Sequence, residues 1–187
     1  MTTEREHWLS ITDDPDWKRN HIHDPAIDIS EELAVLIAYF PKDPKRILEI
    51  GCGYGRLTEA VAEMHPEAKV MGFDINRKIM PSHGKAVYVC GDGDQIPSFS
   101  FDVIYSVAVF QHLDSDQKQA YIEQAAAALN PGGVLVVQFV QGDHDGFCDH
   151  LVPWSRMWEW SEKAGLKTEV GLGLVHVEWA WIVGVKP

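Results

Sequence analysis

Short apolar runs alternate with helical patterns through most of this sequence, and this alternation limits the possible fold more than any other feature. Runs rich in Val, Ile and other apolar residues predict buried strands at residues 46–51, 68–74, 86–92, 101–109 and 132–140. Helical patterns occupy residues 56–64, 75–84, 114–130 and 154–165. Because parallel strands need helical crossovers, the alternation predicts an α/β fold with a parallel sheet covered by helices on both faces.

Two more strands are predicted at the end of the chain, at residues 167–174 and 175–186. Only a short link, Leu172 to Val175, joins them, so they must pair antiparallel. Right-handed crossovers then constrain the sheet to seven strands in the order 3-2-1-4-5-7-6, with the last strand antiparallel.

The start of the chain does not follow this alternation of strands and helices. Residues 28–40 are predicted to be a helix, with Asp28 as its cap, Glu31 as the capping-box partner, and Pro41 and Pro44 ending it. Everything before Asp28 is predicted to be an irregular arm or lid.

The helix at residues 114–130 carries the clearest signals. Asp114 can cap it and Gln117 can complete a capping box, while Asn130-Pro131-Gly132-Gly133 ends it.

Length and composition indicate an ordinary globular domain. The 187 residues fit a single domain, 1–187, with an arm and helix at 1–44 and the core at 45–187. Hydrophobic residues make up 45% and charged residues 24%, which argues against disorder.

Charge and cysteine content narrow the partners and the compartment. The formal charge is −12 and the 16 Lys and Arg are scattered, so we expect no nucleic-acid partner. No export signal and no apolar run long enough to span a membrane are visible. The three widely spaced cysteines, Cys52, Cys90 and Cys148, fit reduced thiols, and we expect a cytoplasmic location. The oligomeric state is left open.

A glycine-rich turn is the strongest chemical signal. Residues 47–55, ILEIGCGYG, place an acid, Glu49, near a strand end and glycines at alternating positions before a helix. Such a turn lets the backbone approach a ligand at the carboxyl edge of a parallel sheet. A dinucleotide fingerprint needs a third glycine where this chain has Arg56, so NAD is the weaker alternative.

A second acid, Asp74, ends the next predicted strand. A carboxylate at this place in a doubly wound fold can accept both hydroxyls of a ribose.

Together these segments resemble the class I S-adenosylmethionine-dependent methyltransferases, in the small-molecule branch of types 11 and 25. The segments that carry the resemblance are ILEIGCGYG (47–55), FDIN (73–76), CGDGDQIP (90–97), FDVIYSVAVFQHL (101–113) and LNPGGVLVV (129–137). The resemblance runs from about Lys45 to Gly142 and more weakly to Pro187. It implies a three-layer Rossmann-like methyltransferase fold and S-adenosylmethionine as the cofactor.

The resemblance also implies the residues that hold the cofactor. Backbone at Gly51, Cys52 and Gly53 would hold its methionine part, with Glu49 supporting the ammonium group. Asp74 would hold the ribose and Ile75 would pack on adenine. Further contacts are implied for Asp92, Gly93, Ser106 and Val107, with Asp94 as a substitute for Asp92.

His112 is the candidate general base, because the loop that carries it borders the methyl group in the family and imidazole titrates near neutrality. The alternative is that His112 anchors its loop by hydrogen bonds. The sulfonium already activates the methyl group, so the protein chiefly aligns donor and acceptor.

The acceptor is expected to be a small, partly apolar molecule held between the arm, the His112 loop and residues 141–158. Candidate contacts are Tyr54, His144, His150 and Trp154. His144, Cys148 and His150 lack the spacing of a metal site, and no metal is predicted. Two alternatives to a methyltransferase stay open, a cofactor-binding protein without turnover and an aminopropyl transferase.

Overall fold

The structure is a computed structural model that describes residues 3–12, 29–142, 145–146, 149–171 and 179–187. Seven strands form its central sheet: β1 (Arg46–Ile50), β2 (Lys69–Asp74), β3 (Val87–Cys90), β4 (Phe101–Ser106), β5 (Leu129–Val140), β8 (Lys167–Gly171) and β9 (Trp179–Val185). Their order is β3-β2-β1-β4-β5-β9-β8, and β9 runs antiparallel to both of its neighbours. The predicted strand order and the antiparallel last strand are confirmed.

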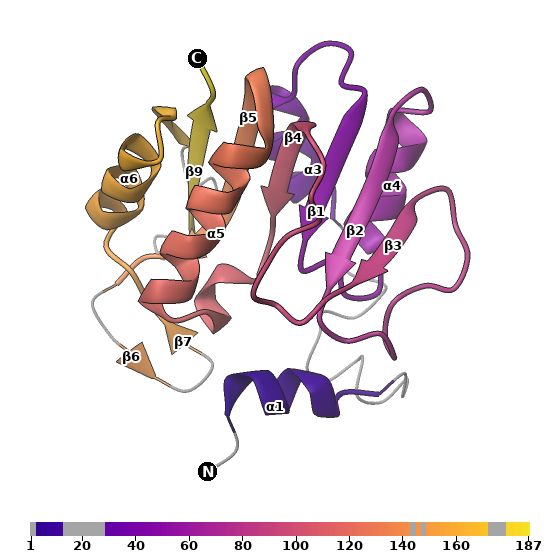
Figure 1. Ribbon diagram of the computed structural model, residues 1–187, viewed down its shortest axis with the longest axis horizontal. Helices are drawn as coiled ribbons and strands as arrows, with labels where there is room; N and C mark the ends of the chain where they lie inside the picture. The colour runs from indigo at the N-terminus through magenta and orange to yellow at the C-terminus, as the bar shows by residue number, and fades with distance from the viewer. Residues whose placement is uncertain (1–2, 13–28, 143–144, 147–148, 172–178) are drawn as a thin grey trace.

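Helices cover both faces of this sheet. Figure 1 shows α5 (Ser115–Ala128) and α6 (Trp154–Lys163) on one side, with α3 (Ser30–Tyr39) and α4 (Arg56–Met64) on the other. Each side has its own apolar cluster. Successive residues of β1 alternate between the two, because Ile47 packs toward α3 and α4 while Leu48 packs toward α5, and both are fully buried. The predicted three-layer arrangement is therefore confirmed.

The capping box predicted for α5 is present. The Asp114 carboxylate accepts from the Gln117 amide at 2.8 Å, and the Gln117 side chain accepts from the Asp114 amide at 3.0 Å. The helix ends at Ala128, before the predicted Asn130, because β5 already begins at Leu129.

The prediction that the chain is irregular before Asp28 is wrong. Helix α1 (Glu4–Ser10) begins with a capping box of its own, in which Thr3 and Glu6 exchange hydrogen bonds of 2.8 and 3.2 Å. The Thr-x-x-Glu spacing was visible in the sequence. In Figure 1, α1 lies across the edge at which β2, β3 and β4 end.

The predicted helix at residues 75–84 is also wrong, since the segment consists of turns. Side chains supply the reason, because Asp74 accepts from the Asn76 amide at 2.8 Å and Asn76 accepts from the Lys78 amide at 3.1 Å. Such local bonds compete with a helix.

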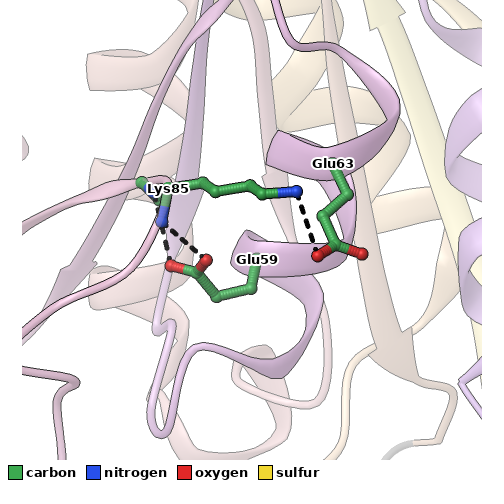
Figure 2. Close-up of polar contacts among 4 residues, drawn as sticks. Glu59, Glu63 and Lys85 are labelled. Carbon is green, nitrogen blue, oxygen red and sulfur yellow. Dashed lines mark hydrogen bonds and ion pairs between the residues drawn. The ribbon is translucent and has the colours of Figure 1, made fainter.

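Helix α4 holds the end of this segment. The Glu59 carboxylate accepts from the backbone amides of Lys85 at 2.8 Å and Ala86 at 3.3 Å, and from the Tyr88 hydroxyl at 2.7 Å. Figure 2 shows Lys85 also reaching Glu63 through its ammonium group, at 3.2 Å.

Other sequence expectations fall at the margins of the described chain. Helix α3 has Ile29 at its N-cap, without a side-chain cap, and the proposed cap Asp28 lies outside the described residues. The link from Leu172 to Val175 lies outside them as well.

Two short strands that were not predicted, β6 (Asp145–Gly146) and β7 (Asp149–His150), form a separate pair. None of the helices described is long and apolar enough to cross a membrane.

Candidate functional site

A cavity of about 960 Å³ lies between α1 and the carboxyl edge of the sheet. Its lining comes from α1, the first turns of α3 and α4, the loops after β1, β2, β3 and β4, and the tryptophans of β9. Pockets for drug-sized ligands reach about 1,000 Å³, so this cavity can hold a cofactor together with a small acceptor.

The glycine turn after β1 forms one wall. The amides of Gly51 and Cys52 both donate to the carbonyl oxygen of Phe73, at 2.7 and 3.0 Å, which fixes the turn against β2. Gly51 has φ +77°, and a Cβ atom there would overlap the side chain of Val109. Only glycine therefore fits at this position without a shift of the wall.

Asp74 lies at the end of β2 with its carboxylate fixed from two sides. It accepts from the amides of Gly53 and Asn76, each at 2.8 Å. Burial raises the pKa of Asp74, and the hydrogen bonds from Asn76 and Gly53 oppose that rise. Each oxygen keeps a lone pair for hydroxyl groups of a ligand.

Glu49 lies deeper and is only 3% exposed. Its carboxyl oxygen accepts from the Tyr105 hydroxyl at 3.0 Å and also from the Thr58 hydroxyl. Burial raises the pKa of Glu49 to about 8, against the lowering effect of these two bonds, and nearby Asp74 adds to the rise. Glu49 is therefore mostly protonated at neutral pH without a ligand.

The end of the cavity expected to take adenine is built by Ile75, Asp92 and Gly93, which all line it. Asp92 accepts from the Asp94 amide at 3.1 Å, and the Gly93 carbonyl accepts from the Tyr121 hydroxyl at 2.6 Å. These bonds fix the loop after β3 around the cavity.

The loop after β4 forms the wall beside the glycine turn, where Val109 lies against Gly51. Val107 lines the cavity, whereas Ser106 is fully buried and donates to the Ile50 carbonyl at 2.9 Å. Ala108 has a left-handed backbone, φ 57°, and its amide donates to the Gln138 side chain at 3.1 Å.

Helix α1 closes the site from outside. The Asn76 side-chain amide, on a residue 2% exposed, donates to the carbonyls of Trp8 at 2.8 Å and Ile11 at 3.0 Å. Arg5 donates to the backbone carbonyl of Asp92 at 3.2 Å. The Trp8 ring packs on His112 with centroids 4.5 Å apart. Ile11, just after α1, is fully buried.

The predicted substrate residues have different surroundings. Tyr54 lines the cavity and donates to the Thr12 carbonyl at 3.2 Å. His150 lies outside the lining, with its ring nitrogen 3.8 Å from the carboxylate of Glu4. Trp154 packs on Trp158, with ring centroids 5.1 Å apart, and also lies outside the lining.

His144 and Cys148 lie outside the described residues. Within the described part of the chain, no group of three or more His, Cys, Asp or Glu side chains could hold a metal ion.

Several lining residues were not predicted. They are Gln111 in the 3₁₀ helix η1 (Phe110–His112), Gln138 on β5, Glu31 and Glu32 on α3, and Trp179 and Trp181 on β9. Trp181 also belongs to the apolar cluster under α3 and α4. The antiparallel direction of β9 was the available signal, because it brings the start of that strand to the carboxyl edge.

S-adenosylmethionine fits these residues. The turn at Gly51 leaves no room for a side chain, Asp74 presents a fixed carboxylate, and the loop carrying Gly93 closes the adenine end. The cavity volume suits a ligand of this size.

Comparisons with known proteins agree. A family described as a methyltransferase domain matches residues 47–133. A trans-aconitate 2-methyltransferase of Rhodopseudomonas palustris is 34% identical over 111 residues, 55% of this chain and 42% of the relative. A malonyl-[acyl-carrier protein] O-methyltransferase of Halalkalibacterium halodurans is 30% identical over 122 residues, 56% of this chain and 44% of the relative. This chain thus spans less than half the length of these two curated relatives.

Solved structures share the fold. A TehB-like methyltransferase from Corynebacterium glutamicum superposes with a TM-score of 0.70 at 23% identity, covering 92% of this chain and 96% of that one. The magnesium protoporphyrin IX methyltransferase of Synechocystis with bound S-adenosylmethionine gives a TM-score of 0.68 at 17% identity, covering 85% and 78%. The strand order, the glycine turn and the match of residues 47–133 to a methyltransferase domain agree, so this chain has the methyltransferase fold and is similar to the class I S-adenosylmethionine-dependent methyltransferases.

Proposed function

We propose that this chain transfers the methyl group of S-adenosylmethionine to a small-molecule acceptor. The observation that carries the proposal is the Asp74 carboxylate, fixed by the Gly53 and Asn76 amides at the rim of a cavity large enough for both molecules. The relatives named for trans-aconitate and for malonyl-[acyl-carrier protein] support methylation as the reaction.

Each wall of the cavity has a separate task in this proposal. Asp74 holds the ribose hydroxyls, and backbone at Gly51, Cys52 and Gly53 holds the methionine end. Ile75, Asp92 and Gly93 enclose adenine. When bound, the cofactor supplies a methyl group already activated for transfer, so the chain mainly orients the two reactants and excludes water.

Three further parts of the chain complete the site. Glu49 would support the cofactor's ammonium group through the loop or water, and that cation would favour its charged carboxylate. Val107, with the buried Ser106 behind it, supports the methionine end. Helix α1 keeps water out through its contacts with Asn76 and His112.

His112 is the proposed general base. It lines the cavity and packs against Trp8 of α1, so an acceptor bound in the cavity can reach it. His112→Ala is expected to lower turnover about 100-fold while leaving cofactor affinity nearly unchanged. If His112 only anchors its loop, cofactor affinity and stability fall together with turnover.

We further propose that residues 1–187 act as one domain in the cytoplasm on an acceptor other than nucleic acid. The formal charge of −12 supports the exclusion of polyanions, and the odd number of widely spaced cysteines supports a reducing compartment. Tyr54 stays the best supported of the predicted substrate contacts, since His150 and Trp154 lie outside the lining.

Calorimetry with S-adenosylhomocysteine and NAD tests the proposal. We expect the demethylated cofactor to bind and NAD to bind far more weakly. Asp74→Ala is expected to weaken binding about 10- to 100-fold, because hydrogen bonds to a charged group contribute roughly 1.5–3 kcal/mol. Asp116→Ala, which removes an exposed carboxylate outside the cavity, is the matched control. Equal affinities of the two variants, or tighter binding of NAD, would contradict the assignment.

A further inference from the structure

Gln111 carries a buried oxygen that lacks a donor. The residue lies on η1, lines the cavity and is 7% exposed. Its side-chain oxygen accepts no hydrogen bond from the residues that the structure describes. A buried acceptor without a hydrogen bond is unfavourable, so this oxygen favours a ligand that brings its own donor.

Trp8 carries the complementary group. Its indole N–H is buried and finds no acceptor in the described chain, although the residue lines the same cavity. An indole N–H can only donate, so it favours a ligand that brings an acceptor. Both residues adjoin His112, because Gln111 precedes it in the chain and the Trp8 ring packs on its imidazole.

A hydroxyl carries a partner for each of these two groups. It has one O–H to donate to Gln111 and lone pairs that accept from Trp8. A carboxylate brings no donor, and an ammonium group brings no acceptor.

The charge of the cavity points the same way. The described lining contains two arginines, Arg5 and Arg56, and seven acidic residues, of which all but the mostly protonated Glu49 carry a charge: Glu4, Glu31, Glu32, Glu49, Asp74, Asp92 and Asp94. An anionic acceptor is repelled by this surplus of acids, whereas a neutral one is not.

The remaining lining favours an aromatic acceptor. Trp8, Trp179 and Trp181 present aromatic surface to the cavity, on which a flat ring can pack. A phenolic hydroxyl also suits His112, because its proton, with a pKa of about 10, passes to an imidazole far more readily than that of an alkyl alcohol.

We propose that the acceptor is a phenol whose hydroxyl binds by donating to Gln111 and accepting from Trp8, and whose single proton turns from Gln111 to His112 and passes to the imidazole as the methyl group is transferred. This inference rests on the proposed methyltransferase function. In the reaction the phenol oxygen forms a bond to the methyl carbon while the carbon–sulfur bond breaks and its electron pair stays on sulfur. The products are an aryl methyl ether, S-adenosylhomocysteine and a protonated imidazole, which then releases its proton to water.

Three probes of equal ring size separate the acceptor groups. They are 4-ethylphenol, 4-ethylaniline and 4-ethylbenzoate, titrated by calorimetry into the protein saturated with S-adenosylhomocysteine. We expect 4-ethylphenol to bind at least about 10-fold tighter than 4-ethylbenzoate, and tighter than 4-ethylaniline. With S-adenosylmethionine carrying a labelled methyl group, only 4-ethylphenol is expected to become methylated efficiently.

Variants then test the two hydrogen bonds. Gln111→Leu keeps the side-chain size but removes the acceptor, and is expected to weaken 4-ethylphenol binding about 10-fold, as the loss of one hydrogen bond does. Trp8→Phe keeps an aromatic ring but removes the N–H, and is expected to weaken it about fivefold. The matched control is Gln119→Leu on α5, outside the cavity, which is expected to change nothing.

The outcomes distinguish a failure of the methyltransferase proposal from a failure of the phenol inference. If S-adenosylhomocysteine itself does not bind, the methyltransferase proposal fails. If it binds, but 4-ethylbenzoate or 4-ethylaniline binds better than 4-ethylphenol or none of the three binds, the phenol inference is overturned alone. Equal effects of Gln111→Leu and Gln119→Leu on 4-ethylphenol overturn it as well, and retained S-adenosylhomocysteine affinity shows that Gln111→Leu is folded.

Discussion

Glu49 links the stability of the free protein to pH. Its pKa in the fold is about 8 because the carboxyl is buried, whereas in the unfolded chain it returns to the ordinary value of 4.5. Between these values the folded state binds the extra proton, so the free energy of unfolding falls as pH rises and levels off above the folded pKa. The slope contributed by one such group is at most about 1.4 kcal/mol per pH unit.

Thermal unfolding of the ligand-free protein from pH 5 to pH 9 checks this. The melting temperature of the wild type is expected to fall across this range more steeply than that of Glu49→Gln, which is neutral throughout. Other acids titrate equally in both proteins, so the difference isolates Glu49. Parallel profiles would show that its carboxyl is not held protonated.

Gly51 and Gly53 offer a matched pair of substitutions in one turn. Both have positive φ, but a Cβ atom at Gly51 would overlap Val109, whereas nothing lies within 4 Å of one at Gly53. Gly51→Ala is expected to lower stability by more than about 2 kcal/mol, and Gly53→Ala by about 1 kcal/mol from its backbone alone. Denaturant unfolding measures both, and equal losses would contradict the close packing of Val109.

Local sequence signals located some site residues and missed others for a physical reason. Glycines before a helix and an acid at a strand end have chemical meaning within a few residues, so Gly51 and Asp74 could be named. Gln111 and Trp179 reach the cavity only through the path of η1 and the direction of β9. The positions of these two residues depend on tertiary structure, and no signal in the neighbouring sequence indicates them.

At the scale of elements, Asn76 is the main attachment of α1. It donates to two carbonyls at the end of that helix, whereas Lys78 reaches the Leu9 carbonyl only from an exposed position at 3.5 Å. Asn76→Ala is therefore expected to speed amide hydrogen exchange in residues 4–11 at least about 10-fold, and Lys78→Ala to leave it nearly unchanged. Unaltered exchange in Asn76→Ala would mean that other contacts hold α1.

Capping signals explain where element prediction worked and where it did not. The box of Asp114 and Gln117 predicts α5 correctly, and the box of Thr3 and Glu6 indicates α1 equally well, although no apolar periodicity follows it. In residues 75–84 the apolar spacing favoured a helix, yet Asp74 and Asn76 bond the local backbone instead. The spacing of apolar residues does not show that polar side chains will bond the backbone in place of helical hydrogen bonds.

At the scale of the whole molecule, the strand order explains why one cavity collects residues from both ends of the chain. Placing β1 and β4 at the centre brings the glycine turn beside the loop of His112, and β9 adds its tryptophans from the far end. Helix α1 then covers the edge. A ligand in this cavity touches most layers of the fold, so its binding free energy is expected to appear in global unfolding.

Thermal unfolding with S-adenosylhomocysteine tests this coupling. A ligand that binds only the folded state at 100 times its Kd stabilises it by about 2.7 kcal/mol, which for a chain of this size raises Tm by roughly 5–10 °C. In Asp74→Ala, with affinity lower by about 10- to 100-fold, the same concentration stabilises by only about 0.4–1.4 kcal/mol, and Tm rises by less than about 6 °C. NAD at that concentration is expected to change neither protein. A Tm that rises equally in both proteins would mean that Asp74 takes no part in holding the ligand, whereas a transition that splits in two would show that the cavity and the far strands β8 and β9 unfold separately.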